Sequence, residues 1–381
     1  MPRTAESPIV LQVLPSLVTG GVERGTVEIA QAIAGAAGTA LVASAGGPLV
    51  RLVERAGGQH IALPLKSKNP WTVWRNAARL EAIIRAERVS IVHARSRAPA
   101  WSAWIACQRT GVPFVTTYHG AYGEDLPFKR AYNAVMARGR IVIAASRFIA
   151  DLVMQRHGVG PERIRVIPRG VDPAVFDPEI VSGLRIATLA QAWNLPHNGR
   201  VVMLPGRLTA WKGHTVLLDA VARLERPEVV AVLVGSHQGR HSYAAALQAQ
   251  AAQLGITEQL RIVGNCDDMP AALKLADVVV HASTQPEAFG RVVIEAQAMA
   301  RPVIASDLGG PVETVQHEAT GWRVPPGDPD ALAAALRRAL DLSPDARAAL
   351  GARARASVPT VRAMQDATLD VYEEVLRTQA A

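Results

Sequence analysis

The stretch VVVHASTQPEAFGRVVIEAQAMA, residues 278–300, shows the pattern that decides the fold. It begins with a short and nearly continuous apolar run, Val278–His281, and passes through a polar loop into residues with helical spacing. Short apolar strands followed by helices are typical of parallel β-sheets whose two faces are both covered. The stretch therefore predicts one strand, loop and helix of an α/β fold.

The same alternation recurs along the chain, which has 381 residues. In the first half the predicted strands are Val10–Leu14, Ala40–Ala43, His60–Leu63, Ile91–His93, Phe114–Thr117, Ile141–Ala144 and Arg165–Ile167. In the second half they are Val201–Pro205, Val229–Val234, Leu260–Val263, Val278–His281, Val303–Ala305 and Trp322–Val324. Helical spacing follows in segments such as Glu23–Ala34, Arg147–His157, Gly213–Glu225, Ser242–Leu254 and Asp328–Leu340. We expect two tandem Rossmann-like domains, each with a doubly wound parallel sheet, that face each other across a cleft.

A stretch that contains several prolines, between Asp172 and Asn198, predicts the boundary between these domains. We place the first domain at residues 1–180 and the second at residues 181–359. Ligands of open parallel sheets bind beyond the carboxyl ends of the strands. The loops that follow the strands are therefore the places to look for functional residues.

The composition is that of a folded globular protein, with 49% hydrophobic and 19% charged residues. The two cysteines, Cys107 and Cys266, are too few and too far apart for a disulfide framework or a zinc site built from cysteines. No apolar run approaches the roughly 18 residues that a membrane-spanning helix needs. The N-terminal residues make a poor signal peptide. These features predict a cytoplasmic protein.

The formal net charge of +8 is unevenly distributed. Residues 1–190 hold 23 Lys and Arg against 13 Asp and Glu, whereas residues 191–381 hold 18 against 20. A basic protein can bind nucleic acid, but no nucleic-acid-binding module or regular basic and aromatic pattern accompanies this charge. We expect no nucleic-acid partner.

The loop after the strand Val278–His281 carries Glu287, Phe289 and Gly290, and Glu295 follows in the next helix. The free N–H groups and the dipole at a helix N-terminus favour anions, and a glycine there lets a ligand approach the backbone. The two carboxylates lie about 10 Å apart at the helical rise plus the loop, which matches the reach from a sugar to a ribose in a nucleotide-sugar. The alternative is a capping glutamate and a solvated helix glutamate.

A second loop, residues 206–214 with the sequence GRLTAWKGH, follows the strand Val201–Pro205. Phosphates commonly bind at the first strand-to-helix loop of such a domain. Arg207 and Lys212 would neutralise a diphosphate there, together with the charge that grows when it leaves. The alternative is a pair of solvated cations.

These motifs together resemble those of the retaining glycosyltransferases of family 4, which have the GT-B fold, and of the members that assemble lipopolysaccharide and envelope polysaccharide. The motifs are Arg207 and Lys212, the Glu287 and Glu295 pair, and the segments Arg301–Ser306 and Gly309–Glu313. The resemblance extends over nearly the whole chain, because it includes Gly20–Glu23 and Val166–Asp172. Arg169 departs from the asparagine that the family more often has there.

The resemblance implies a role for each matching residue. Arg207 and Lys212 would bind the donor diphosphate, Glu287 the transferred sugar and Glu295 the ribose. The backbone of Phe289 and Gly290 would lie against the sugar and phosphate, and His119, which follows the strand Phe114–Thr117, would help to position the sugar. The resemblance also implies that the last helix, in residues 360–381, packs back on the first domain.

Gly20 and Gly21 lie between the first strand and the helix Glu23–Ala34. Paired glycines there would let the backbone close over a phosphate of the donor or over the acceptor. A turn that needs a positive φ is an equally good local interpretation.

We expect no metal ion and no cofactor other than the donor substrate. His237 and His241 have the spacing of a metal-binding pair, but no nearby carboxylate completes a ligand set. Asp267 and Asp268 are not a convincing metal motif either, because Asp268 precedes an apolar helical run and suits an N-cap.

The helix predicted at Trp71–Arg88 has a mixed aromatic and basic face. At 100° per residue its apolar residues share one side. Trp71, Trp74 and Arg75 lie on the opposite side, with Arg79 at its edge, and Lys66 and Lys68 lie just upstream of the helix. Tryptophans beside cations on an exposed face suit an anionic lipid surface. The alternative is a solvated helix whose tryptophans cover a neighbouring loop.

The expected function is therefore transfer of a sugar, with retention, from a nucleotide-sugar to a glycolipid or polysaccharide acceptor in bacterial envelope or lipopolysaccharide biosynthesis. The protein would be peripheral on the inner face of the cytoplasmic membrane. Three other classes stay open. These are a nucleotide-sugar epimerase of the same fold, a non-catalytic sugar-nucleotide- or lipid-binding protein, and a nucleic-acid-binding protein.

Overall fold

The computed structural model describes residues 7–380 apart from residues 19, 125–126, 237–238 and 240. The chain forms two compact units, one of Met1–Pro168 with Val361–Ala381 and one of Arg169–Thr360. The division falls at Pro168, upstream of the residue 180 inferred from the Pro-rich stretch. Val171 already belongs to the second unit, because it pairs with Thr360 and its N–H donates to Pro359 O at 2.9 Å.

The first unit is built on a parallel sheet of seven strands in the order β3-β2-β1-β4-β5-β6-β7. Every strand predicted for this half is present, within one or two residues at each end. Their bounds are β1 (Ile9–Val13), β2 (Thr39–Ser44), β3 (Gln59–Ala62), β4 (Ile91–Ala94), β5 (Phe114–Tyr118), β6 (Ile141–Ala144) and β7 (Ile164–Val166). β4, β5 and β6 are buried along their whole length, and β1 and β2 at every position but the first, which is why their sequences are mostly apolar.

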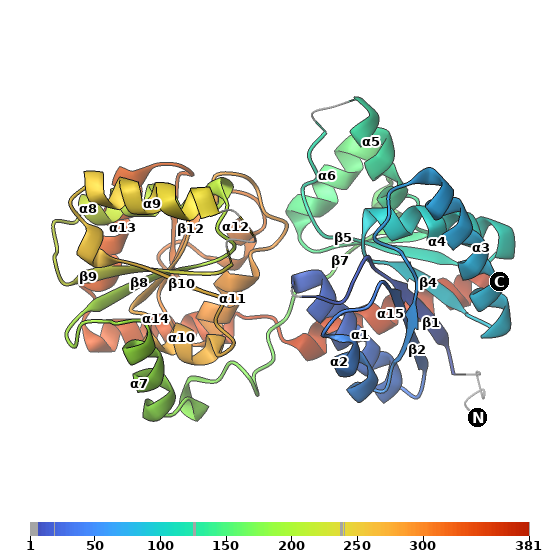
Figure 1. The fold of residues 1–381 in the computed structure, drawn as a ribbon. Helices are drawn as coiled ribbons and strands as arrows, with labels where there is room; N and C mark the ends of the chain where they lie inside the picture. Colours follow the sequence, from blue (N-terminus) through green and yellow to red (C-terminus); the bar gives the residue numbers. More distant parts are fainter. Residues whose placement is uncertain (1–6, 19, 125–126, 237–238, 240, 381) are drawn as a thin grey trace. The chain divides into compact units, whose positions relative to one another are not determined.

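The helices of the first unit are α1 (Gly21–Gly35), α2 (Val50–Arg55), α3 (Pro70–Ala86), α4 (Arg97–Thr110), α5 (Pro127–Asn133), α6 (Arg147–His157) and α15 (Val361–Ala380). The last of these, drawn in red, lies beside α1 (Figure 1). Met364, Val371, Tyr372 and Val375 of α15 are buried in the same core as Ile29 and Ile33 of α1. The C-terminal helix is thus part of the first unit.

The second unit has a parallel sheet of six strands in the order β10-β9-β8-β11-β12-β13. The strands are β8 (Arg200–Pro205), β9 (Val229–Val234), β10 (Leu260–Gly264), β11 (Val278–His281), β12 (Val303–Ser306) and β13 (Trp322–Val324). The helices are α7 (Gly183–Ala192), α8 (His214–Ala222), α9 (His241–Gln253), α10 (Met269–Leu275), α11 (Arg291–Ala298), α12 (Pro311–Thr314), α13 (Pro329–Leu340) and α14 (Pro344–Ala356). Two Rossmann-like parallel sheets therefore follow each other along the chain, as predicted.

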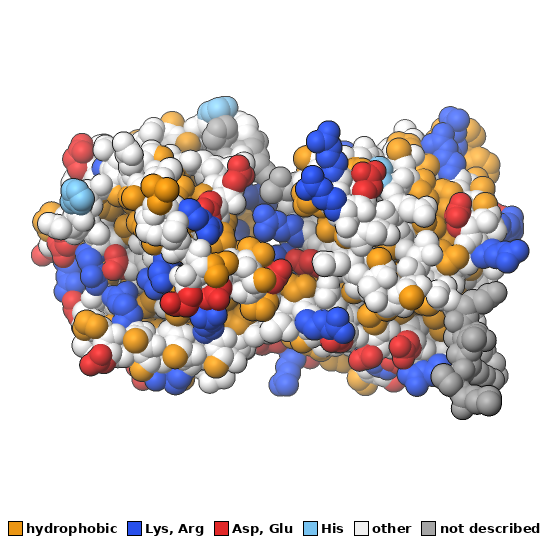
Figure 2. Space-filling view, turned by 90° about the horizontal axis from the view of Figure 1, so that it is seen from below, with side chains coloured by type: hydrophobic (Ala, Val, Ile, Leu, Met, Phe, Trp, Pro, Cys, Tyr) orange, Lys and Arg blue, Asp and Glu red, His pale blue; other side chains and the backbone are white. Residues whose placement is uncertain are grey.

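Charges of both signs cover the surface. On the face shown in Figure 2, Asp and Glu side chains lie among the Lys and Arg side chains on both units. Ion pairs at close range join charges of opposite sign in each unit, for example Arg85 with Glu81 at 2.7 Å and Arg226 with Asp341 at 2.8 Å. Much of the positive charge is therefore balanced locally.

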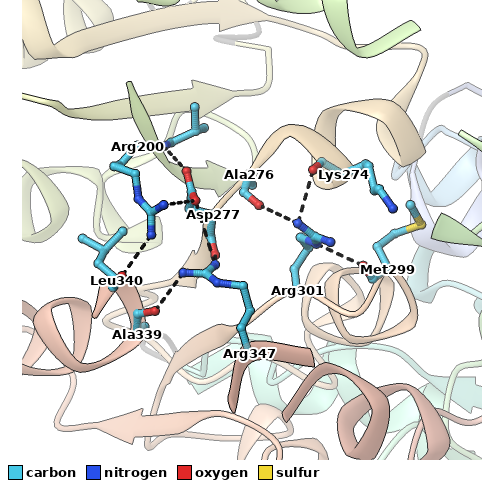
Figure 3. Close-up of polar contacts among 10 residues, drawn as sticks. Arg200, Lys274, Ala276, Asp277, Met299, Arg301, Ala339, Leu340 and Arg347 are labelled. Atoms are coloured by element: carbon cyan, nitrogen blue, oxygen red, sulfur yellow. Dashed lines mark hydrogen bonds and ion pairs between the residues drawn. The ribbon is translucent and has the colours of Figure 1, made fainter. Parts of the chain in front are cut away.

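At the amino edge of the second sheet, arginines bind the ends of several helices (Figure 3). Arg200 donates to Leu340 O and Arg347 to Ala339 O, both at the C-terminus of α13. Arg301 donates to Met299 O after α11 and reaches the carbonyls of Lys274 and Ala276 at the end of α10. These bonds satisfy carbonyl groups that a helix leaves without an internal partner.

A single carboxylate, Asp277, joins this cluster. Its side chain accepts from Val201 N at 2.8 Å and forms ion pairs with Arg200 at 3.4 Å and Arg347 at 3.9 Å. We expect Asp277→Asn to lower the free energy of unfolding by about 2 kcal/mol, because the partly buried guanidinium groups lose their counter-charge. Thermal unfolding measures this. The control is Asp267→Asn, an exposed aspartate in the same unit, and equal melting temperatures for both variants would contradict the expectation.

Candidate active site

The order of the strands in the second unit reverses between β8 and β11, which marks the ligand-binding end of such a sheet. The loop after β8 carries Arg207 and Lys212, and the loop after β11 carries Glu287. Lys212 Nζ lies 2.6 Å from Glu287 Oε1, although the two residues are 75 positions apart. The loop that carries Lys212 and the loop that carries Glu287, which were identified separately in the sequence, are therefore in contact.

Glycines hold these loops together by backbone contact. Gly213 has a φ of +75°, and a Cβ there would lie 1.9 Å from Ala282 O, so no other residue fits. Gly310 donates its N–H to Glu287 O at 2.8 Å, and a Cβ on it would lie 2.4 Å from Ala288 O. Thr284 N donates to Trp211 O at 2.8 Å. The loops after β8, β11 and β12 therefore form one platform.

The Glu287 carboxylate accepts hydrogen bonds from three side chains, all at Oε1. Besides Lys212 these are His281 Nε2 at 2.7 Å and the hydroxyl of Ser283. Burial by itself raises the pKa of the Glu287 carboxyl, but His281 and Lys212 outweigh burial and hold the pKa well below its usual range. Glu287 is thus an ionised, anchored acceptor at neutral pH.

The sequence interpretation missed His281 and Ser283. Both lie in the stretch Val278–Ala300 and both are buried. A signal was available, because His281 ends an otherwise apolar strand directly before the candidate loop. A polar side chain at that position needs a partner, and the nearest candidate was the loop glutamate.

The other residues that were predicted to bind the nucleotide-sugar donor lie at the same edge of the sheet. Arg207 is exposed, and within the described part of the chain its side chain makes no hydrogen bond or ion pair. Phe289 is buried, and Gly290, with a φ of +79°, is the N-cap of α11. Glu295 lies one turn further into α11, where Arg291 Nε approaches its Oε1 to 3.1 Å. The structure brings these residues to one sheet edge, and their individual roles remain predictions.

His214, the first residue of α8, is fully buried two positions after Lys212. Its Nδ1 lies 3.4 Å from the Tyr243 hydroxyl, and its Nε2 has no hydrogen-bond partner among the described residues. Burial, assisted by the charge of Lys212, lowers the pKa of His214 to about 4. The ring is therefore neutral in the folded protein at neutral pH.

This histidine makes stability depend on pH. In the unfolded chain the ring takes up a proton near pH 6.5, whereas in the folded protein it does so only near pH 4, so acid favours unfolding between these values. From pH 7 to pH 5 the contribution to the free energy of unfolding falls by about 2 kcal/mol. We expect His214→Gln to lose this part of the pH dependence in thermal unfolding at the two pH values. The exposed His317→Gln is the control, and a pH dependence unchanged in His214→Gln would contradict the assignment.

In the first unit, His119 directly follows β5, at the carboxyl end of the sheet, and is half-buried. Two residues earlier, the Thr117 hydroxyl lies 2.7 Å from His93 Nε2, and His93 Nδ1 lies 2.7 Å from the Tyr372 hydroxyl of α15. This buried chain connects the end of β5 with the C-terminal helix.

Gly21 begins α1, and Gly20 is its N-cap. Gly20 has a φ of 164°, which is extended backbone, so the interpretation as a turn that needs a positive φ is wrong. The Glu23 side chain lies close enough to Gly20 that a Cβ there would be 2.4 Å from Glu23 Oε2. The N-terminus of α1 is therefore already faced by a carboxylate of its own first turn.

The aromatic and basic face of α3 is exposed as predicted. Ala77, Leu80 and Ile84 are buried, whereas Trp71 and Trp74 are 65% and 51% exposed. The two indoles stack on each other, with ring centroids 5.4 Å apart. Lys66, Lys68, Arg75 and Arg79 are exposed as well. The alternative, in which the tryptophans cover a neighbouring loop, does not fit these exposures.

Within the ranges that the structure describes, no three His, Cys, Asp or Glu side chains are grouped so that they could hold a metal ion. His237 lies outside the described residues, and His241 is the first residue of α9. The N-cap role of Asp268 is confirmed, since its side chain accepts from Ala271 N at 3.1 Å at the start of α10. The same carboxylate binds Arg185 of α7 at 2.6 Å and 2.8 Å.

Comparisons with known proteins identify the family of the chain. Residues 186–357 match the family model described as Glycosyl transferases group 1, and residues 19–175 match the model described as Glycosyltransferase Family 4. The D-inositol 3-phosphate glycosyltransferase of Jonesia denitrificans is 33% identical over 69% of this chain and 66% of that relative. The enzyme of the same name from Salinispora arenicola is 32% identical over 78% of this chain and 71% of that relative. The chain thus spans just under two thirds of the first relative and somewhat more of the second.

Solved structures extend the similarity to nearly the whole chain. A glycosyltransferase from Rickettsia africae ESF-5 has 34% sequence identity and a TM-score of 0.90, over 97% of this chain and 99% of that one. Anabaena HepE in complex with UDP-glucose has 25% identity and a TM-score of 0.84, over 96% and 99%. The chain therefore belongs to the family 4 glycosyltransferases and has their two-domain GT-B fold.

Proposed function

We propose that the protein transfers a sugar from a nucleoside diphosphate sugar to an acceptor hydroxyl and retains the configuration at the anomeric carbon. The observation that carries this proposal is the Lys212 and Glu287 pair, 2.6 Å apart at the carboxyl edge of the second sheet. A fixed cation for the diphosphate and an ionised acceptor for sugar hydroxyls lie side by side. The UDP-glucose bound to the similar Anabaena protein supports a donor of this class.

In such a transfer Lys212 and Arg207 would have related roles at the diphosphate. Lys212 would give up its contact with Glu287 in part and neutralise the diphosphate, and the exposed Arg207 would add a second positive charge. The acceptor oxygen forms a bond to the anomeric carbon on the face from which the diphosphate leaves. The bond from that carbon to the phosphate oxygen breaks, and the acceptor proton passes to the leaving oxygen. Stabilising the charge that develops on the diphosphate is the main contribution of the protein.

The donor can be identified without knowing the acceptor. A thermal-shift panel of UDP-, GDP-, ADP- and CMP-sugars is expected to show stabilisation by one of the nucleoside diphosphate sugars and none by the CMP-sugars, which carry a single phosphate. A ligand at 100 times its dissociation constant adds about 2.7 kcal/mol to the free energy of unfolding. If no member of the panel raises the melting temperature, the proposed donor class is wrong. Turnover of the donor without an acceptor would favour the epimerase alternative.

We propose that this reaction needs no metal ion, because Arg207 and Lys212 supply the positive charge at the diphosphate. Transfer is then expected to continue at an unchanged rate when EDTA is added. A loss of activity that Mg²⁺ or Mn²⁺ restores would show that a metal ion shares this task.

The acceptor that we propose is a glycolipid or polysaccharide of the bacterial envelope, lipopolysaccharide among them, reached from the inner face of the cytoplasmic membrane. No helix in the described part of the chain is long and apolar enough to cross a membrane. The exposed face of α3 instead supports contact with an anionic lipid surface. The relatives named for inositol 3-phosphate indicate a second class, a phosphorylated polyol. Parallel assays with inositol 3-phosphate and with a glycolipid fraction separate the two.

Removing this face should strongly weaken membrane binding. Trp71→Ala/Trp74→Ala/Arg75→Glu is expected to lower binding to vesicles of phosphatidylglycerol and phosphatidylethanolamine at least tenfold, because stacked indoles and a cation are lost together. Co-sedimentation measures this. The control is Leu52→Ala/Arg51→Glu, which changes an exposed apolar residue and a cation on α2 of the same unit. Equal binding by the wild type and the α3 variant would refute the membrane face.

A further inference from the structure

His281 is the last residue of β11 and lies behind the Glu287 carboxylate. Its side chain is 3% exposed, and its Nε2 lies 2.7 Å from Glu287 Oε1. The Ser283 hydroxyl reaches the same oxygen and lies 3.3 Å from the His281 ring. His281 ends the central strand β11, Ser283 follows it by two residues, and both residues are buried.

The contacts show which ring nitrogen of His281 donates a hydrogen bond to Glu287. The carboxylate can only accept, so Nε2 carries the hydrogen that it donates. His281 Nδ1 is buried and has no hydrogen-bond partner among the described residues. Nε2 is therefore the ring nitrogen that donates to Glu287, and Nδ1 takes no part in this contact.

The two carboxylate oxygens of Glu287 differ in how many hydrogen bonds they accept. Oε1 receives Lys212, His281 and Ser283, whereas within the described residues no donor is recorded for Oε2. The side chain of Glu287 is 15% exposed, so part of it is open to a ligand. One oxygen anchors the carboxylate, and the other is available.

Lys212 cannot be the lasting anchor if it also binds the donor. A lysine that moves towards a diphosphate weakens its contact with Glu287, and a glutamate has enough rotamer freedom to turn away. His281 is the last residue of β11, Ser283 lies two residues beyond it, and both are buried, so they keep their contacts when Lys212 moves. We propose that His281, together with Ser283, is a positioning pair that holds Glu287 by Oε1 and presents Oε2 to a hydroxyl of the donor sugar.

This inference deepens the proposed function and rests on it. It predicts an effect that a merely structural histidine would not have, because the proposed function assigns Glu287 to the sugar and not to the nucleotide. Loss of the positioning pair should weaken the preference for the sugar nucleotide over the free nucleoside diphosphate. The affinity for the free nucleoside diphosphate should stay the same.

The experiment compares His281→Leu, which removes the donor, with His281→Gln, whose amide can donate from nearly the same position. Calorimetric titration with UDP-glucose and UDP, or the corresponding pair selected by the thermal-shift panel, gives the ratio of the two affinities. We expect His281→Leu to lower this ratio and the kcat of transfer at least tenfold, with the affinity for the free nucleotide changed less than twofold. His281→Gln should recover most of the loss, and Ser283→Ala should give a smaller one.

The control is His317→Leu, which replaces a half-exposed histidine of the same unit. An unchanged ratio in His281→Leu, or equal losses in His281→Leu and His281→Gln, would overturn the positioning role while leaving the proposed function intact. If the wild type binds none of the sugar nucleotides, the proposed function fails, and the positioning role fails with it. Melting temperatures of all variants show whether a loss comes from unfolding.

Discussion

Lys212→Ala is expected to lower the kcat of sugar transfer by about two to three orders of magnitude. Mutation of a single group that stabilises developing negative charge typically has an effect of this size. The side chain is 12% exposed and is held over the loop after β11, so it is placed before the donor binds. The fold should survive, because His281 and Ser283 still donate to Glu287 after the lysine is removed. Initial rates of nucleoside diphosphate release measure the change.

A matched control distinguishes this role from a general effect of charge. Lys274→Ala also removes a lysine of the second unit, but Lys274 lies on α10 at the amino edge of the sheet, where only its backbone carbonyl joins the arginine cluster (Figure 3). Its activity should equal that of the wild type. Equal activities of Lys212→Ala and wild type would remove Lys212 from the site.

Glu287→Gln is expected to lower kcat by about two orders of magnitude while the protein stays folded. The amide has the shape of the carboxylate but lacks its charge, so the acceptor oxygen for a sugar hydroxyl becomes weaker. Glu287→Ala should cost about 1–3 kcal/mol of stability as well, because His281 Nε2 and Lys212 Nζ lose their acceptor. Transfer rates and thermal unfolding, measured on both variants, separate the two effects.

Glu258→Gln is the control for this pair, since Glu258 is exposed near the start of β10. If Glu287→Gln keeps the rate of the wild type, the negative charge at this position has no part in the reaction. If Glu287→Ala melts at the wild-type temperature, the network seen around the carboxylate does not contribute to stability.

The strands could be predicted because a strand that is buried on both faces has a continuous run of apolar residues. Val229–Val234 is apolar at every position and forms β9 with these bounds. Helix α4 was not predicted, because Ala98, Ala100, Ala103, Ala106 and Cys107 bury it on more than one side and blur its amphipathic period. Helix α7 was missed because it lies inside the Pro- and Gly-containing stretch that was interpreted as a linker.

The candidate site was only partly predictable. Spacing and position at strand ends placed Lys212 and Glu287 at one edge, and the structure brings them into contact. The anchoring of Glu287 by His281 and Ser283 depends on how the loop turns back after β11, and that path is set by Gly309 and Gly310 of another loop. Local sequence patterns do not contain such a contact. Likewise, the carboxylate of Glu23 over Gly20 follows from a side-chain rotamer that spacing does not reveal.

The carboxyl edge of the second sheet is proposed to hold a nucleoside diphosphate through Lys212. Calorimetric titration of UDP, GDP, ADP and dTDP into the wild type and Lys212→Ala measures this binding. We expect at least one of them to bind the wild type saturably with one site. We expect Lys212→Ala to bind this nucleotide at least tenfold more weakly, whereas Lys274→Ala should bind it like the wild type. Binding of none of the four, or equal binding by Lys212→Ala and the wild type, would show that Lys212 does not hold a nucleoside diphosphate at this edge.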